Sequence, residues 1–116
     1  MVSGARTLFR SQALVGCNVV NAQGEDLGRI EEFVIDPDRG CIEYAVLSFG
    51  EIFGSGEKFF AVPWEALRID GDRGQFVMDV TKAALEEGQG FDPDTWPPSP
   101  DRRIFRRDEH ADDGTC

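Results

Sequence analysis

The segment from Glu25 to Trp64 constrains the fold most, because it holds three strand-like stretches joined by short connections. The stretches read EDLGRIEEFVID, CIEYAVLSFG and KFFAVPW, with the tetrapeptide PDRG between the first two and a Gly-rich loop before the third. Strands joined so closely must pair antiparallel, because a parallel crossover takes about a dozen residues or more. A chain of 116 residues can cover such a sheet only by curling it or by packing a second layer on it. The segment therefore predicts one small, antiparallel, all-β domain.

The first of these stretches alternates imperfectly between apolar and polar residues. Leu27, Phe33 and Ile35 share one parity, while Ile30 falls on the other. An extra residue near Glu31–Glu32 would restore the register, and such β-bulges bend strands in curved sheets. We therefore expect a bulged, bent strand here.

Turn and capping residues mark the other boundaries. In the sequence DPDRG, Pro37 presets the backbone of a turn and Gly40 can adopt the left-handed conformation that ends a short hairpin. Thr81 is expected to cap a short helix that Gly88 closes. The expected strands span 16–20, 26–36, 41–49, 59–62, 68–69 and 75–80, and the expected helix spans 82–87.

Two strands, 44–49 and 59–62, are apolar on both faces. A strand with one face in water should alternate cleanly, so both faces of these strands need cover. The interior covers one face, and a helix, an arm or a second subunit must cover the other. We therefore predict a homo-oligomer, with a dimer favoured. In a monomer, the segment 89–98 would supply the cover, with Phe91 and Trp96 packed on the sheet.

The loop from Gly50 to Lys58 joins these two strands. It is not a phosphate-binding P-loop, which requires Gly-Lys followed by Ser or Thr at the start of a helix; here Glu57 precedes Lys58 and a strand follows. Apolar residues at the tip of a Gly-flanked loop either fold back on the core or present a contact surface. The candidate interface residues, on the strands and at this tip, are Tyr44, Leu47, Phe49, Ile52, Phe53, Phe59 and Phe60.

The residues show no catalytic, cofactor-binding or metal-binding constellation. The one histidine, His110, stands in the expected tail, where nothing positions it as the base for a nucleophile. The turn 70–74 opens with the Asp-x-Asp of a calcium loop but lacks its later ligands, and Thr81 stands where the bidentate Glu belongs. We therefore expect no enzymatic activity, no cofactor and no metal.

The three cysteines are an odd number without a CxxC pair, which predicts neither a disulfide framework nor a zinc site. Cys17 and Cys41 stand at strand starts and are expected to act as small apolar residues. This pattern indicates a reducing compartment, the cytoplasm. The sequence also contains neither an apolar run of about 20 residues, as a membrane span requires, nor the apolar core of a secretory signal.

The net charge of -10 argues against broad nucleic-acid binding, which normally uses a basic face. We divide the chain into an arm (1–10), a barrel domain (11–98) and a flexible C-terminal tail (99–116). The tail can bind the acidic barrel of the same or a neighbouring molecule, remain solvated, or bind an external polyanion. The candidate contact residues of this tail are Arg102, Arg103, Phe105, Arg106 and Arg107.

Several blocks in one order resemble the PRC-barrel family: LVGCNVVNAQGEDLGRIEEFVID, RGCIEYAVLSFG, GSGEKFFAVPWEAL and FDPDTWP. The resemblance covers residues 11–97 and implies a small, strongly bent β-barrel of about six strands. The family includes the cytoplasmic part of the photosynthetic reaction-centre H subunit and the C-terminal domain of a ribosome maturation factor. In both, the barrel acts in assembly and docking. The short free-standing bacterial members, which this chain resembles, mostly have no assigned activity.

The resemblance implies a non-enzymatic protein-interaction or assembly module that binds protein partners, and the two-sided apolar strands predict that it also binds itself. One alternative is an RNA- or ribosome-associated maturation factor, which would need the arginines of segment 102–107 as its contact. Another, by family analogy alone, is an accessory of an electron-transfer complex. Fold likeness does not by itself transfer a function.

Overall fold

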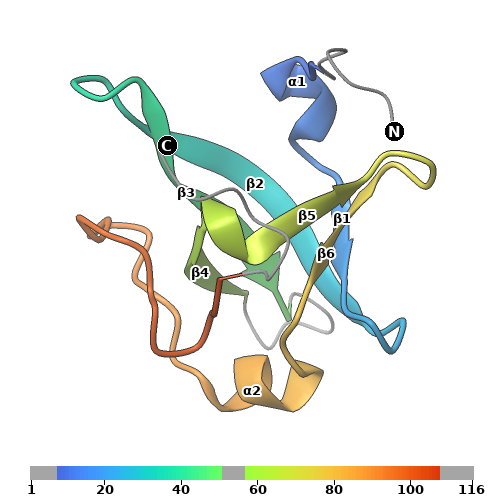
Figure 1. The fold of residues 1–116 in the computed structure, drawn as a ribbon. Coiled ribbons are helices and arrows are strands. Elements are labelled where there is room, and N and C mark those ends of the chain that lie inside the picture. The colour runs from blue at the N-terminus through green and yellow to red at the C-terminus, as the bar shows by residue number, and fades with distance from the viewer. Residues whose placement is uncertain (1–7, 51–56, 108–116) are drawn as a thin grey trace.

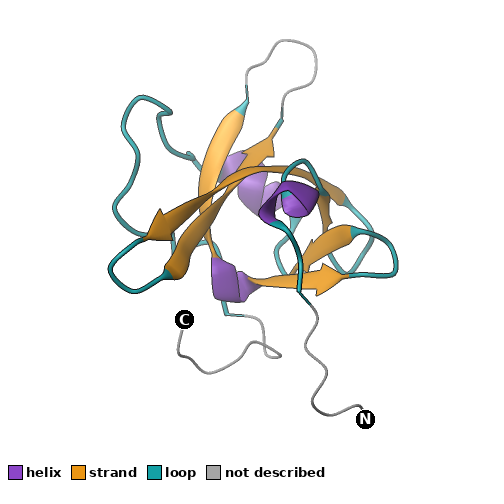
Figure 2. Ribbon diagram, turned by 90° about the horizontal axis from the view of Figure 1, so that it is seen from above, coloured by secondary structure: helices purple, strands orange, loops and turns teal. Residues whose placement is uncertain are grey.

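The computed structural model describes residues 8–50 and 57–107. Within these residues, six strands form one curled sheet in the order β4-β3-β2-β1-β6-β5, which wraps into a half-barrel (Figures 1 and 2). The expectation of a small, bent β domain with a short helix near its C-terminal end is confirmed. The elements are α1 (Ser11–Leu14), β1 (Asn18–Val20), β2 (Asp26–Asp36), β3 (Cys41–Phe49), β4 (Lys58–Pro63), the 3₁₀ helix η2 (Trp64–Ala66), β5 (Leu67–Asp70), β6 (Gln75–Met78) and α2 (Lys82–Glu87).

The sheet is mixed rather than wholly antiparallel. Sequence neighbours β1–β2, β2–β3, β3–β4 and β5–β6 pair antiparallel, as short connections require. β1 and β6 run parallel, with Val19 opposite Phe76 and Val20 opposite Val77. The antiparallel prediction is therefore wrong for this pair. Turn chemistry could not reveal it, because these two strands are joined by most of the domain and not by a turn.

β2 carries the predicted bulge and a second irregularity. Its pairing with β3 jumps from Ile30 to Glu32, so the extra residue is Glu31. Ile30 and Phe33, on either side of this bulge, therefore both pack in the main core despite their different parity. The register shifts again between Val34 and Ile35, and the Ile35 side chain is 55% exposed. The sequence did not predict this second shift, which turns a large apolar side chain toward solvent.

β3 is buried on both faces, as its two-sided apolar pattern predicts. Leu47 and Phe49 belong to the main core, which fills the curled sheet. Tyr44 and Val46 belong to a smaller cluster on the opposite face, together with Ala61 of β4. Successive side chains of a strand point to opposite faces, so these two clusters lie on either side of the sheet. The expected need for cover on both faces is confirmed.

Gly28 lies at a close approach of β2 to β3. Its φ of 125° belongs to a region that L-residues rarely adopt. A Cβ atom at this position would lie 2.0 Å from the carbonyl oxygen of Ser48. The sheet can therefore bend at this point only because residue 28 has no side chain, a requirement that the sequence pattern did not reveal.

Local turn chemistry positions the β2–β3 hairpin and α2. Asp36 Oδ1 accepts a hydrogen bond from the backbone N–H of Asp38 at 3.0 Å, and Gly40 closes the turn with a φ of 69°. The Thr81 hydroxyl accepts the backbone N–H of Ala84 at 3.1 Å and so caps α2. Both features were predicted. The one-turn helix α1 was not, because four residues offer too short a pattern.

Candidate functional site

The C-terminal segment, defined here as residues 89–107, runs past the outer edge of the sheet beside β4 (Figure 1, orange to red). The backbone N–H of Phe91 donates to the carbonyl of Phe59 at 2.7 Å, and that of Asp101 donates to the carbonyl of Ala61 at 2.8 Å. An edge strand exposes unpaired carbonyls that attract other strands. Here the same chain satisfies two of those carbonyls on β4.

The C-terminal segment also covers the smaller apolar cluster. Phe91 packs on Phe59 with ring centroids 6.2 Å apart, and Trp96 packs on Phe91 at 5.4 Å. The Tyr44 hydroxyl donates a hydrogen bond to the carbonyl of Pro97 at 2.8 Å. Burial raises the pKa of Tyr44, and the neighbouring carboxylates of Glu43 and Glu32 raise it further. The cover suggested for a monomer, by segment 89–98, is the arrangement that this chain shows.

The end of the C-terminal segment is anchored in the main core. Phe105 is 2% exposed and meets the Phe60 ring edge-on, with centroids 5.9 Å apart. Arg102 forms an ion pair with Glu65 of η2 at 2.5 Å. Burial tends to raise the pKa of Glu65, but the hydrogen bond and charge of Arg102 outweigh burial and hold this pKa below its usual value. This contact is one of the alternatives foreseen for the arginine cluster, the acidic barrel of the same molecule.

The structure places the predicted interface residues inside the protein itself. Tyr44, Leu47, Phe49 and Phe60 are buried, and Phe59 is partly buried beneath Phe91. In this conformation, these side chains contact their own chain. Ile52 and Phe53, at the tip of the loop, lie outside the described residues. The proposed contact role of all seven stays a prediction.

The tail residues are divided between the interior and the surface. Phe105 is buried, whereas the Arg103 side chain is 91% exposed and contacts Asp101 at 3.3 Å. Arg106 and Arg107 are also exposed, and Arg107 helps to lower the pKa of Glu65. Residues 99–107 thus run along the barrel, and residues 108–116 lie outside the described part of the chain.

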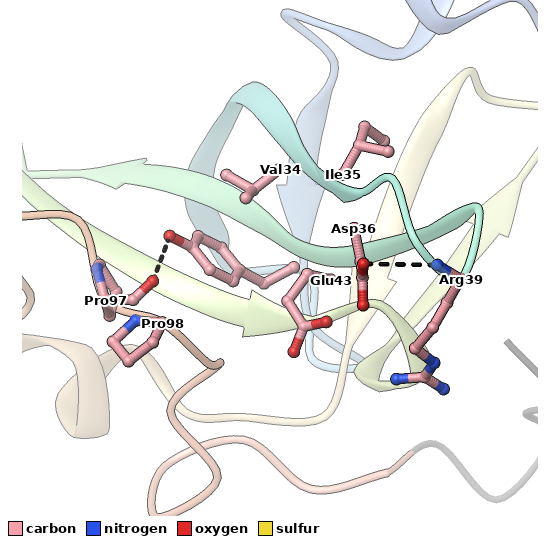
Figure 3. Close-up of a pocket in the computed structure, with 8 residues that line it drawn as sticks. Val34, Ile35, Asp36, Arg39, Glu43, Pro97 and Pro98 are labelled. Carbon is pink, nitrogen blue, oxygen red and sulfur yellow. Dashed lines mark hydrogen bonds between the residues drawn. The ribbon is translucent and has the colours of Figure 1, made fainter.

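A groove of about 460 Å³ lies between the β2–β3 hairpin and the C-terminal segment. Figure 3 shows Val34 and Ile35 on the hairpin and Pro97 and Pro98 across from them. The groove exists because the second register shift turns Ile35 outward and because Tyr44 holds the segment at Pro97. The groove is lined by Val34, Ile35, Asp36, Arg39, Glu43, Tyr44, Pro97 and Pro98.

Charged residues surround the apolar part of the groove. Asp36 Oδ1 accepts the backbone N–H of Arg39 at 3.4 Å, which keeps both residues at the hairpin end. Glu43 lies beside them (Figure 3). Of the eight lining residues, sequence reasoning had selected only Tyr44. The other seven could not be recognised from the sequence because the groove forms only when Pro97 and Pro98 pack beside the hairpin. Tyr44 and Pro97, which hydrogen-bond there, are 53 positions apart in the chain.

Cys41 is disulfide-bonded, whereas Cys17 is a free thiol. The expectation of no disulfide is therefore wrong for Cys41, whereas its burial agrees with the small apolar role expected for it, and the cytoplasmic location stays a prediction. Residues 8–50 and 57–107 contain no group of three or more potential metal-ligating His, Cys, Asp or Glu side chains. None of the helices in this described part is long and apolar enough to cross a membrane.

A comparison with protein families agrees with the resemblance seen in the sequence. The model of the PRC-barrel domain family matches residues 6–85. No curated protein matches the chain significantly. Among solved structures, the chain is similar to a candidate 16S ribosomal RNA processing protein, RimM, of Pseudomonas aeruginosa, with a TM-score of 0.43 and 18% sequence identity. The similarity covers 65% of this chain and 45% of that one, so the chain spans less than half of that protein.

Proposed function

The chain belongs to the PRC-barrel domain family, and from this premise we propose that it is a non-enzymatic protein-interaction module. Its partner site is the groove between the β2–β3 hairpin and the C-terminal segment. All of the latter segment lies beyond residue 85, where the family match ends. The barrel therefore supplies one wall of the site, and a stretch outside the family match supplies the other.

The observation that carries the proposal is the exposed apolar surface at this groove. Ile35 is 55% exposed and Trp96, which precedes the lining prolines, is 43% exposed. Soluble proteins usually hide such large side chains when they cluster, unless a partner covers them. An apolar centre with a charged rim, here Asp36, Arg39 and Glu43, is the usual anatomy of a protein interface.

The chemistry of the lining residues supports binding over catalysis. Nucleophilic catalysis needs a hydroxyl, thiol or amine beside a positioned base. The eight lining residues offer a phenol, two carboxylates and a guanidinium, but no such pair. The phenol of Tyr44 is already engaged with Pro97, and its raised pKa keeps it protonated at neutral pH.

The test is capture of partners from cells of the source organism with the full chain and two variants. Ile35→Asp places a charge in the groove, while the control Ala83→Asp places the same charge at an exposed position on α2. We expect one defined protein to be retained by the native chain and by Ala83→Asp and lost with Ile35→Asp. If every retained protein is equally retained by Ile35→Asp, the groove is not the partner site.

A second candidate function, an RNA-associated factor, has one specific observation in its favour. Segment 102–107 exposes Arg103, Arg106 and Arg107, and the Arg102 side chain is 59% exposed despite its ion pair. Phosphate contacts would make the affinity fall steeply with salt. Fluorescence anisotropy with a labelled single-stranded RNA, for the native chain and a variant with all four arginines changed to Gln, tests this. No binding by the native chain at low salt would eliminate the candidate.

A further inference from the structure

The large exposed apolar side chains among the described residues gather in two places. One place is the groove, with Ile35 in its wall and Trp96 next in sequence to the lining Pro97. The other is the N-terminal part of the chain, where Leu8 is 76% exposed and Phe9 is 44% exposed, with Val15 at the end of α1. In Figure 1, α1 and the β2–β3 hairpin lie at different corners of the molecule. One molecule therefore presents two separate apolar surfaces.

The two surfaces differ in charge. The first 24 residues contain Arg6 and Arg10 and no acidic residue, although the whole chain carries a net charge of -10. The groove holds Asp36 and Glu43, and Glu32 is close enough to raise the pKa of Tyr44 in its wall. Arg39 is the one cation among the eight lining residues, so the carboxylates outnumber it and the rim stays acidic. Two acidic surfaces repel each other, so the groove is electrostatically complementary to the N-terminal segment and not to a second groove.

We propose that the segment Leu8–Arg10 of a second copy of this chain occupies the groove. Its Leu8 and Phe9 side chains pack against Ile35 and the two prolines of the groove, and its Arg10 faces the carboxylates of the rim. The volume of about 460 Å³ lies within the range of about 300–1,000 Å³ typical of binding pockets, enough for two large side chains. This inference rests on the proposed function and names a partner for the same site.

The proposed contact joins two different surfaces, the N-terminal segment of one copy and the groove of another. This difference determines which assemblies can form. If each of two molecules inserts its segment into the groove of the other, a closed dimer forms; if the insertions do not close, a chain of copies forms. Both assemblies use the same contact. A contact between two grooves, or between two N-terminal segments, would use identical surfaces instead.

The test is sedimentation velocity of the purified full chain over a concentration series, with single variants on each side of the contact. Phe9→Asp disables the N-terminal segment, Ile35→Asp disables the groove, and Ala83→Asp is the matched control on α2. We expect the native chain and the control to associate, and each disabling variant to associate at least about tenfold more weakly. An equimolar mixture of the two disabling variants should recover association, because one intact segment then meets one intact groove.

Charge reversal gives a second, milder test. Arg10→Glu and Glu43→Arg should each weaken self-association, and their mixture should recover it, because opposite charges then face each other in both contacts. Added salt should weaken the association of the native chain. Circular dichroism of each variant checks that the fold is kept, which we expect because the Phe9, Arg10 and Ile35 side chains are exposed and Glu43 is only partly buried.

Three results would overturn the inference. If the native chain sediments as a monomer at every concentration, a second copy is not the occupant of the groove. The proposed function is then still decided by the capture experiment. Association that survives Phe9→Asp removes the N-terminal segment. Two variants that fail to rescue each other, in both the apolar pair and the charge pair, show that the segment of one copy does not meet the groove of another.

Discussion

The apolar outer face of β3 and β4 and the groove beside the β2–β3 hairpin lie on the same side of one sheet, but their exposure differs. Tyr44, Val46 and Ala61 are at most 3% exposed because residues from the C-terminal segment cover them. Ile35 is 55% exposed because the second register shift carries it past the end of that cover. The chain thus covers the apolar outer face of β3 and β4 with its own C-terminal segment and leaves the smaller apolar surface of the groove exposed. The residues of the covered face stabilise the fold, whereas those of the groove are available to a partner.

The largest effect should come from removing the anchor of the covered face. Phe105→Ala should lower the free energy of unfolding by about 3–5 kcal/mol, because a fully buried ring against Phe60 is lost. Urea denaturation followed by tryptophan fluorescence measures this loss. A loss below about 1 kcal/mol would mean that the end of the C-terminal segment does not hold the cover in place.

A smaller effect is expected at the point where the covered face meets the groove. Tyr44→Phe keeps the ring but deletes the hydroxyl that donates to Pro97, so stability should fall by about 0.5–1.5 kcal/mol. The same variant should speed amide hydrogen exchange at Phe91, whose N–H bonds to β4. An unchanged exchange rate at Phe91 would mean that the hydrogen bond between Tyr44 and Pro97 does not help to hold the rest of the C-terminal segment on β4.

Acid should weaken the cover further along the same segment. The pKa of Glu65 is lowered in the folded protein relative to its ordinary value of 4.5. A lowered folded pKa contributes stability above the unfolded pKa, and this stability is lost as pH falls through the folded pKa. The ion pair is partly exposed, so we expect a contribution of only about 0.5 kcal/mol. Denaturation of the native chain and of Arg102→Gln, at neutral pH and below pH 4.5, should show a larger acid-induced loss in the native chain.

The smallest effect on stability is expected in the open groove. Ile35→Asp should change the free energy of unfolding by less than about 0.5 kcal/mol, because the side chain is mostly in water already. Its effect should appear in binding and self-association instead. A large loss of stability in this variant, measured by the same urea titration, would place Ile35 with the covered face and erase the distinction between the two regions.

Elements that depend on neighbouring residues were predictable from the sequence. The turn residues from Asp36 to Gly40, the bulge at Glu31 and the Thr81 cap each have a local cause, and each is present in the structure. The bounds of the third strand, Cys41–Phe49, and of the helix Lys82–Glu87 were also predicted correctly. The curled β architecture followed from these short connections together.

Features that depend on distant residues were not predictable in the same way. The parallel pairing of β1 with β6 and the close approach at Gly28 arise only when the sheet has curled. For the candidate site, the pattern did show that β3 needs cover on both faces, and it included segment 89–98 among the possible covers. It could not show where that segment ends on the hairpin, so Ile35 and Pro98 were not recognised as walls of a groove.

The long separation between Tyr44 and Pro97 also has a consequence for biosynthesis. When β3 and β4 emerge from the ribosome, the residues that will shield their outer surface have not yet been made, since Tyr44 must wait for a residue 53 positions later. Contacts between such distant residues form slowly, and unshielded strands are prone to aggregate in the meantime. We therefore expect nascent chains stalled before residue 91 to bind chaperones and chains released after residue 107 to escape them, which cross-linking of stalled ribosome complexes can measure.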